Sequence, residues 1–393
     1  MLKQTVCRWS LLVHAAIFVG ALVVVLLGSV TTCPTTLAAD DDSKATPGAK
    51  DLGARGSTAA SARLGKRAPV VHRDLSLERS AMRRGLDYLK GQQKTSGAVG
   101  GEFPVAVTSL AGLAFLGYGS SYSRGPFAVE IRKCLDYVIG SADRDGFLSE
   151  KKPESKMHGH GMALLFLTQV FGDLPADRQR EVAGVIQRGI KCIRRGKSWR
   201  GGWTYHWDNK ENDDEASVTI GVVQALRAAD NIGFRVESSL IEAAIKYVKK
   251  SQTSDGSFQY SLNPVRGGQG SQTTFALTAA AVSTLNAAGV YESVELRRGF
   301  DFMEKELSRV RGKPKSAIQD PFFYYGALYA SQAYFQRGGR AWSEWYTEMR
   351  SFLLRKQKSD GRWVDQAYGD EFGTAVGALI LAMPIQYLPI FQR

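Results

Sequence analysis

The sequence is poor in cysteine: it has four in 393 residues, and Cys7 and Cys33 fall in the N-terminal region around an apolar run. The remaining two, Cys134 and Cys192, are too few to form a disulfide scaffold in a domain of this size. Both fall on the apolar stripe of an expected helix. We expect them to be buried small hydrophobic residues, although an oxidising location would allow them to pair.

The sequence also lacks the loops and nucleophiles of several large enzyme classes. No glycine-rich phosphate loop follows a strand pattern, since "RGGQG" at residues 266–270 has no strand before it. No serine or cysteine stands in a recognisable nucleophile motif. Enzymes that use ATP or a nicotinamide cofactor are therefore not expected, and the sequence indicates no cofactor.

Basic residues outnumber acidic ones, 51 to 38, which gives a formal net charge of +13. Such a surface attracts anionic lipid head groups, acidic polysaccharide or nucleic acid. However, the basic residues are scattered along expected outer helices and are not gathered beside aromatic residues. We therefore expect a solvated surface and no nucleic-acid partner.

The N-terminus has the pattern of an export signal. Lys3 and Arg8 precede an apolar run at residues 11–30, and three aspartates follow at residues 40–42. This order places the body of the protein in the periplasm or the extracellular space. Because the run is long enough to span a bilayer, three outcomes stay open: a cleaved signal, a membrane tether through residues 11–30, and a lipid anchor at Cys33.

Composition divides the chain into three parts. Residues 1–39 are the signal peptide or membrane anchor. Residues 40–77 are rich in Ala, Gly, Ser and charged residues without apolar periodicity, so we expect a disordered linker. Only residues 78–393 are expected to fold.

The folded part contains six copies of one pattern, each starting at an aromatic-plus-apolar pair or its equivalent. In three copies a Gln follows five residues later; in five copies a Gly stands nine residues after the start of the pair, with an apolar residue two beyond. The pairs begin at Tyr88, Tyr137, Cys192, Tyr247, Phe302 and Phe352, and the glycines are Gly97, Gly146, Gly201, Gly256 and Gly361. Ala142 and Lys197 replace the Gln in two copies, and the fifth copy lacks both Gln and Gly. A repeat of this length indicates one supersecondary unit per copy.

Each copy predicts a pair of helices. The first is amphipathic, as in "LERSAMRRGLDYLKGQQ" at residues 77–93, and the Gly that follows allows a turn with positive φ that the large apolar residue covers. The second is apolar almost all round, as at residues 105–118, 161–171, 216–229 and 273–288, so it must be buried on all sides. The sequence therefore predicts an all-α (α/α)6 toroid, in which six outer helices surround an inner ring of six.

The repeat, most complete in "RSFLLRKQKSDGRW" and "YVKKSQTSDGSF", resembles that of the prenyltransferase and squalene cyclase superfamily over residues 80–393. The resemblance implies the same toroid. It does not fix the activity, because this fold carries triterpene cyclases, protein prenyltransferase β-subunits and exported proteins of unknown role.

The inner helices are expected to run in one direction, so their N-termini meet at one mouth of the toroid. Converging helix N-termini favour negative groups. The candidate acids there are Asp213, Asp214 and Glu215. The candidate ligand-binding residues are His158, His160, Trp203, Tyr205, His206, Trp207, Gln272, Tyr324, Tyr325 and Asp370.

Three adjacent acids repel one another, and in a dry mouth at least one would have a raised pKa, as a proton donor requires. The acid motif Asp-x-Asp-Asp-Thr-Ala of the squalene-hopene cyclases resembles residues 211–216, which implies that Asp213 is the protonating acid. Two departures weaken the match: Glu211 replaces the first Asp, and Glu215 replaces the Thr. A simpler alternative for Asp320 and Asp370 is capping of the helices that follow.

A metal site is a further alternative. The zinc ligands of the prenyltransferases include a Cys, and here both candidate cysteines lie on outer helices, so that site is not expected. His158 and His160, with Asp213 or Asp214, could hold a divalent ion, but a pair of histidines at a helix start is equally typical of a polar entrance. We assign no metal ligands.

The combined pattern predicts an exported protein of the cell envelope that binds a small molecule, an isoprenoid or a glycan, or a partner at the polar mouth. One alternative is an enzyme, either a cyclase with Asp213 as the acid or a polysaccharide lyase or hydrolase. That alternative requires a deep pocket lined by aromatic residues such as Phe166, Phe275, Tyr324 and Tyr325. Another is a structural protein that binds through its basic outer face.

Overall fold

The computed structural model describes residues 74–149, 156–210, 212–264, 273–310 and 322–391. Contacts divide the chain into Met1–Lys66 and Arg67–Arg393, and every described residue belongs to the second unit. The predicted signal at residues 1–39, with its tether at 11–30, and most of the linker at 40–77 lie outside the described residues. Across the described ranges, no helix is both long and apolar enough to cross a membrane.

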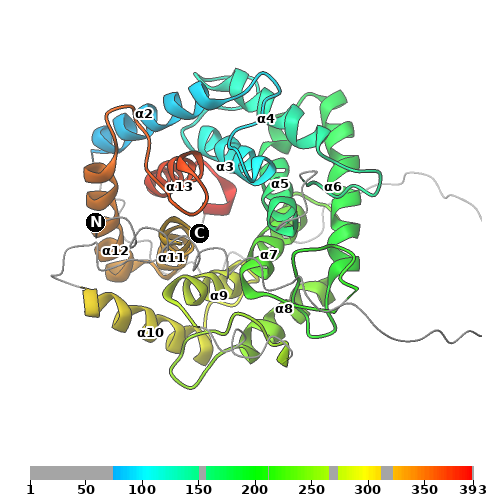
Figure 1. The fold of residues 1–393 in the computed structure, drawn as a ribbon, viewed down its shortest axis with the longest axis vertical. Helices are drawn as coiled ribbons and strands as arrows, with labels where there is room; N and C mark the ends of the chain where they lie inside the picture. The colour runs from blue at the N-terminus through cyan, green and yellow to red at the C-terminus, as the bar shows by residue number, and fades with distance from the viewer. Residues whose placement is uncertain (1–73, 150–155, 211, 265–272, 311–321, 392–393) are drawn as a thin grey trace, which may run out of the picture. The chain divides into compact units, whose positions relative to one another are not determined.

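The prediction of an all-α toroid is confirmed: the described helices form two concentric rings (Figure 1). The outer ring consists of α2 (Ser76–Gln92), α4 (Ala128–Gly140), α6 (Ala176–Gly196), α8 (Ser238–Lys250), α10 (Val294–Val310) and α12 (Gly339–Lys356). The inner ring consists of α3 (Pro104–Gly117), α5 (Lys156–Val170), α7 (Ala216–Asn231), α9 (Phe275–Ala287), α11 (Phe323–Arg337) and α13 (Asp370–Ala382). Each inner helix contacts the next, and α13 contacts α3, so the inner ring is closed.

The inner helices pack closely because small residues lie where they meet. A Cβ atom at Gly161 of α5 would lie 3.0 Å from the carbonyl carbon of Gly221 on α7. The outer helices bury only one face, as their period of apolar residues predicts. Cys134 and Cys192 lie on that face and are fully buried, as expected from the sequence, and they do not form a disulfide.

The joint between the two helices of a copy is fastened by the Gln and Gly of the repeat. The Nε2 group of Gln252 donates to the carbonyl of Gly256 (3.1 Å) and to the carbonyl of Glu295 on the following outer helix (2.8 Å). Gly256 has a φ of +93°, which favours glycine. The Gln252 side chain, just after the end of α8, therefore attaches this outer helix to the next one, α10.

The ring closes through the same contact. Gln357, after the last outer helix, donates to the carbonyl of Gly361 and to the carbonyl of Ala81 on α2, both at 2.8 Å. An ion pair between Arg350 and the buried Glu78 joins the same two helices. The first and last copies are therefore held together by the contact that joins neighbouring copies.

Replacing a joint glycine should destabilise the toroid. At Gly256 a Cβ atom would lie 2.4 Å from the carbonyl oxygen of Arg298, and φ is positive, so Gly256→Ala should lower the free energy of unfolding by about 2 kcal/mol or more. In Gly91→Ala, the matched control in α2, the new Cβ meets nothing within 4 Å. Urea denaturation of both variants measures the difference, and equal stabilities would contradict the role of the joint.

Candidate functional site

The two ends of the inner ring differ. At the end where the inner helices finish, the C-terminal segment runs over α3 to α5. Leu388 is buried beside Gly117 of α3, and Ile390 N donates to Gln169 Oε1 of α5 at 3.2 Å. The opposite end, where the inner helices begin, carries most of the polar residues singled out in the sequence. We call this end the mouth.

His160 has a structural role that the repeat explains. In three copies the backbone N–H of the residue that covers the joint donates to a threonine of the inner helix: Val99 to Thr108, Trp203 to Thr219, and Trp363 to Thr374. In the second copy the N–H of Leu148 donates to His160 Nδ1 at 3.0 Å, so Nε2 donates to the Gly189 carbonyl at 3.1 Å. Burial lowers the pKa of His160 to about 4.

The expected position of the histidine pair, ahead of the second inner helix, is wrong. Both His158 and His160 lie inside α5, because that helix begins at Lys156. The two ring nitrogens of His160 are engaged as described, so it cannot serve as a metal ligand while these contacts persist. Among the described residues, no group of three His, Cys, Asp or Glu side chains could hold a metal ion.

Three further candidates, Trp203, His206 and Trp207, have different surroundings. Trp203 is fully buried, and its indole N–H donates to the Ile193 carbonyl of α6 at 2.7 Å. Trp207 packs near Phe147, with ring centroids 6.3 Å apart, while His206 is exposed. Trp203 therefore belongs to the joint between α6 and α7.

Asp214 is a fully buried acid that holds the fourth copy in place. Its Oδ1 atom accepts hydrogen bonds from Tyr247 Oη (2.9 Å), Ser261 Oγ (3.1 Å) and the N–H of Leu262 (2.9 Å). Its Oδ2 atom accepts from Arg200 at 3.1 Å. These four donors come from three segments, so the carboxylate ties the start of α7 to α8 and to residues 261–262.

Asp213 supports the same segment. Its Oδ1 atom accepts from the N–H of Asp214 at 2.9 Å and from Asn263 Nδ2 at 2.8 Å. Asn209 holds the backbone of Asp213 from both sides, through its N–H and its carbonyl. Together Asp213 and Asp214 fix the stretch that contains Tyr260.

Glu215 is the acid of the mouth that accepts a hydrogen bond from a tyrosine. Its side chain is buried, and Oε1 accepts a hydrogen bond from Tyr205 Oη. The Tyr205 and Tyr260 hydroxyls are 2.6 Å apart, so Tyr260 donates to Tyr205 when Tyr205 donates to Glu215. The His158 ring lies 5.8 Å from the Tyr205 ring, and burial lowers the pKa of His158 to about 4. The mouth therefore contains an acid, two linked tyrosines and a neutral imidazole.

Two tyrosines of α11 extend this cluster across the ring. Tyr325 Oη donates to the Ser217 carbonyl of α7 at 3.3 Å, and burial raises its pKa, with Tyr329, Tyr368 and Glu215 nearby. The rings of Tyr325 and Tyr329 meet edge to face, 4.8 Å apart. Tyr329 is 1% exposed, and its hydroxyl has no hydrogen-bond partner among the described residues. A buried hydroxyl of this kind costs free energy until something binds it.

Asp370 begins α13 and takes part in a second polar group. Its Oδ1 atom accepts from the N–H of Asp365 at 3.1 Å, and its Oδ2 atom lies 3.0 Å from Arg362 Nε. Burial raises the pKa of Tyr324, with Asp365 and Asp370 adding to the effect. Asp370 does not act as a side-chain cap, because residue Gly369 occupies the cap position. Gln272, Asp320 and Glu211 lie outside the described residues.

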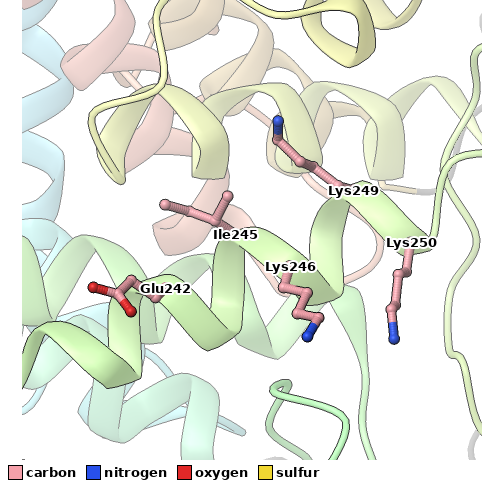
Figure 2. Close-up of a pocket in the computed structure, with 5 residues that line it drawn as sticks. All are labelled: Glu242, Ile245, Lys246, Lys249 and Lys250. Atoms are coloured by element: carbon pink, nitrogen blue, oxygen red, sulfur yellow. The ribbon is translucent and has the colours of Figure 1, made fainter.

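The aromatic lining expected for an enzyme pocket is only partly present. Phe166 packs against Gly112 of α3, and Phe275 stacks on Trp345 of α12. A hollow of about 410 Å³ lies instead on α8, lined by Glu242, Ile245, Lys246, Lys249 and Lys250 (Figure 2). None of these residues belongs to an inner helix, so the hollow is separate from the mouth.

Comparison with known proteins agrees with this architecture. A family model described as the squalene-hopene cyclase C-terminal domain matches residues 165–318. The type II terpene cyclase MstE from Scytonema is 12% identical, with a TM-score of 0.55 over 80% of this chain and 100% of that chain. The GH76A alpha-1,6-mannanase from Salegentibacter sp. HEL1_6 is 11% identical, with a TM-score of 0.55 over 79% of this chain and 99% of that chain. No curated protein matches the sequence.

Residues 165–318 thus resemble the squalene-hopene cyclases, and the described residues have the toroid fold of the terpene cyclase. The resemblance of residues 211–216 to the cyclase acid motif implies a protonating role for Asp213, which stays a prediction. The side chains of Asp213 and Asp214 accept hydrogen bonds from residues 261–263 and so hold that segment. Glu215, which stands in place of the motif's threonine, faces the tyrosines instead.

Four residues of the toroid were not singled out as candidate site residues from the sequence: Tyr260, Tyr329, Asp365 and Tyr368. The repeat held a usable signal for two of them. Tyr205 and Tyr260 each follow the residue that covers the joint by two positions, after Trp203 and Phe258, and Asp365 follows Trp363 in the same way. Side chains at this position of the repeat therefore reach the mouth.

His160 should make the toroid sensitive to acid. The pKa of His160 is about 4 in the folded protein and about 6.5 in the unfolded chain. The stability that depends on a neutral His160 is therefore present above pH 6.5 and is lost as the pH falls toward 4. Between pH 7 and pH 5 the loss due to this residue should be about 2 kcal/mol. His160→Thr, which restores the threonine of the other copies, should remove that loss in urea denaturation, whereas the exposed control His206→Thr should not. An acid response unchanged by His160→Thr would disprove the assignment.

Proposed function

We propose that the toroid binds a small organic ligand at the mouth, through Glu215, Tyr260 and Tyr329. The observation that carries the proposal is the Tyr329 hydroxyl, which is buried without a partner among the described residues. The Tyr329 ring contacts that of Tyr325, whose hydroxyl donates to the Ser217 carbonyl, two residues after Glu215 of the hydrogen-bonded chain. A bound hydroxyl or carbonyl group would satisfy the Tyr329 hydroxyl. Binding sites commonly combine aromatic walls with a few polar groups that fix the ligand's orientation.

Isoprenoids and glycans are the two ligand classes that we propose for the mouth. Structures of the same fold hold both: a variant of MstE is in complex with geranylgeranyl dihydroxybenzoate, and an inactive variant of the mannanase is in complex with alpha-1,6-mannotetrose. Aromatic rings suit either class, since both offer C–H groups to a ring face. The hydroxyls and carboxylates at the mouth provide partners for the polar groups of either ligand.

An enzyme is the second candidate. A proton donor at the mouth must hold a proton at neutral pH, and burial raises the pKa of Asp365, which favours that role for Asp365. Asp213 and Asp214 suit it less, because their carboxylates already hold residues 261–263. Cyclisation of an isoprenoid or cleavage of a polysaccharide would both use such an acid.

We also propose that the protein is exported and works in the cell envelope. The support is the sequence alone: basic residues precede the apolar run at residues 11–30, and aspartates follow it. A cleaved signal and a retained anchor remain the two main forms of this proposal. Mass determination of the mature N-terminus would distinguish them.

Removing the hydrogen bonds of the tyrosine chain should weaken binding. Glu215→Gln and Tyr260→Phe should each raise the Kd about tenfold, because each loses a hydrogen bond that positions the ligand's polar group. Isothermal titration calorimetry with geranylgeraniol and with linear tetrasaccharides measures the effect, and Tyr291→Phe at an exposed position is the matched control. The proposal fails if no probe binds the wild-type protein or if both mouth variants keep wild-type affinity.

A further inference from the structure

Asp365 is a buried acid with an oxygen that the fold does not use. It is 7% exposed, and its Oδ1 atom accepts from the N–H groups of Ala367 (3.0 Å) and Tyr368 (2.6 Å). Its Oδ2 atom has no hydrogen bond among the described residues. Burial raises the pKa of this carboxyl, and the nearby Asp370 adds to the effect. Asp365 Oδ2 is not among the fully buried polar atoms, so it reaches the surface as an acceptor that a ligand's donor can approach.

Tyr368, held by Asp365, is the centre of an aromatic cluster. Its ring centroid lies 4.9 Å from that of Phe372, 5.9 Å from that of Phe322, and 6.0 Å from that of Phe103. These rings come from the starts of α13, α11 and α3, which are three neighbouring inner helices. All four side chains are only partly buried. We call Phe103, Phe322, Tyr368 and Phe372 the aromatic platform.

We propose that Asp365 and the aromatic platform form a second subsite of the mouth, which binds a sugar ring of a carbohydrate ligand. This inference rests on the proposed function and names its ligand class. One face of a sugar ring presents C–H groups, which pack against the negative face of an aromatic ring. Its edge presents hydroxyl groups, one of which donates to Asp365 Oδ2.

A hydrocarbon ligand fits this subsite less well. An isoprenoid lying on the platform would cover Asp365 without offering a donor, and so would bury an unsatisfied carboxyl. A hydrocarbon would also leave the buried Tyr329 hydroxyl of α11 without a partner. A ligand with many hydroxyl groups satisfies both.

The second subsite lies close to the first. Phe322 of the aromatic platform directly precedes α11, and Tyr325 in the first turn of α11 donates to the Ser217 carbonyl, two residues after Glu215. The Glu215 cluster and the Asp365 subsite therefore both lie near the start of α11. An oligosaccharide of a few residues could contact both.

The experiment uses the full chain and four probes: maltotetraose, cellotetraose, alpha-1,6-mannotetraose and geranylgeraniol. Asp365→Asn keeps an oxygen for the N–H groups of Ala367 and Tyr368 but replaces the acceptor Oδ2 with a donor. We expect at least one tetrasaccharide to bind the wild-type protein at millimolar concentration or below in isothermal titration calorimetry. Asp365→Asn and Phe372→Leu should each raise that Kd about tenfold.

The matched control for the acid is Asp255→Asn. Asp255 also accepts a backbone N–H two residues on, from Ser257, but it lies exposed in the joint of the fourth copy. The variant Asp255→Asn should leave the Kd of the tetrasaccharide unchanged. Thermal melting should show Asp365→Asn at least as stable as the wild-type protein, which separates a binding defect from misfolding.

The outcomes distinguish this inference from the proposed function. If Glu215→Gln and Tyr260→Phe weaken binding while Asp365→Asn and Phe372→Leu do not, the second subsite is wrong and the mouth remains a binding site. If geranylgeraniol binds and none of the tetrasaccharides does, the carbohydrate assignment is wrong. If all four variants bind like the wild-type protein, both proposals fail.

Discussion

The fold depends on how closely each joint approaches the following outer helix. At Gly361 a Cβ atom would lie 2.3 Å from the carbonyl oxygen of Arg84, and at Gly256 it would lie 2.4 Å from that of Arg298. No side chain fits there, so a glycine with positive φ lets the turn press on the neighbouring helix. The adjacent Gln amide then bonds to that helix. Since this contact sets the direction in which each inner helix starts, it also determines which residues reach the mouth.

The fold could be predicted from the sequence because each copy contains the same two kinds of helix. One helix has an apolar stripe and the other is apolar all round, and only a closed double ring buries both kinds. The sequence could not show that the last copy attaches to the first through Ala81. That contact joins residues that are far apart in the chain but uses the chemistry of a local joint.

The candidate site could be predicted only in part. The segment that contains Glu215 was found because three acids in a row are unusual at a helix start. Which acid faces the tyrosines depends on side-chain direction, and Asp214 turns toward Tyr247 whereas Glu215 turns toward Tyr205. Tyr260 and Tyr329 join the site from other copies. The position of Tyr260 in the repeat held a signal, whereas no local pattern marks Tyr329. His160 looked functional because it forms a pair with His158 at a helix start, yet it makes the contact that a threonine makes elsewhere.

The bond between Ile390 and Gln169 bears on how a long molecule could use this ring. Because the C-terminal segment lies over the ends of α3 and α5, it covers that part of the far end of the ring. A chain-like molecule that enters between the helix starts would meet this segment beyond α3 and α5.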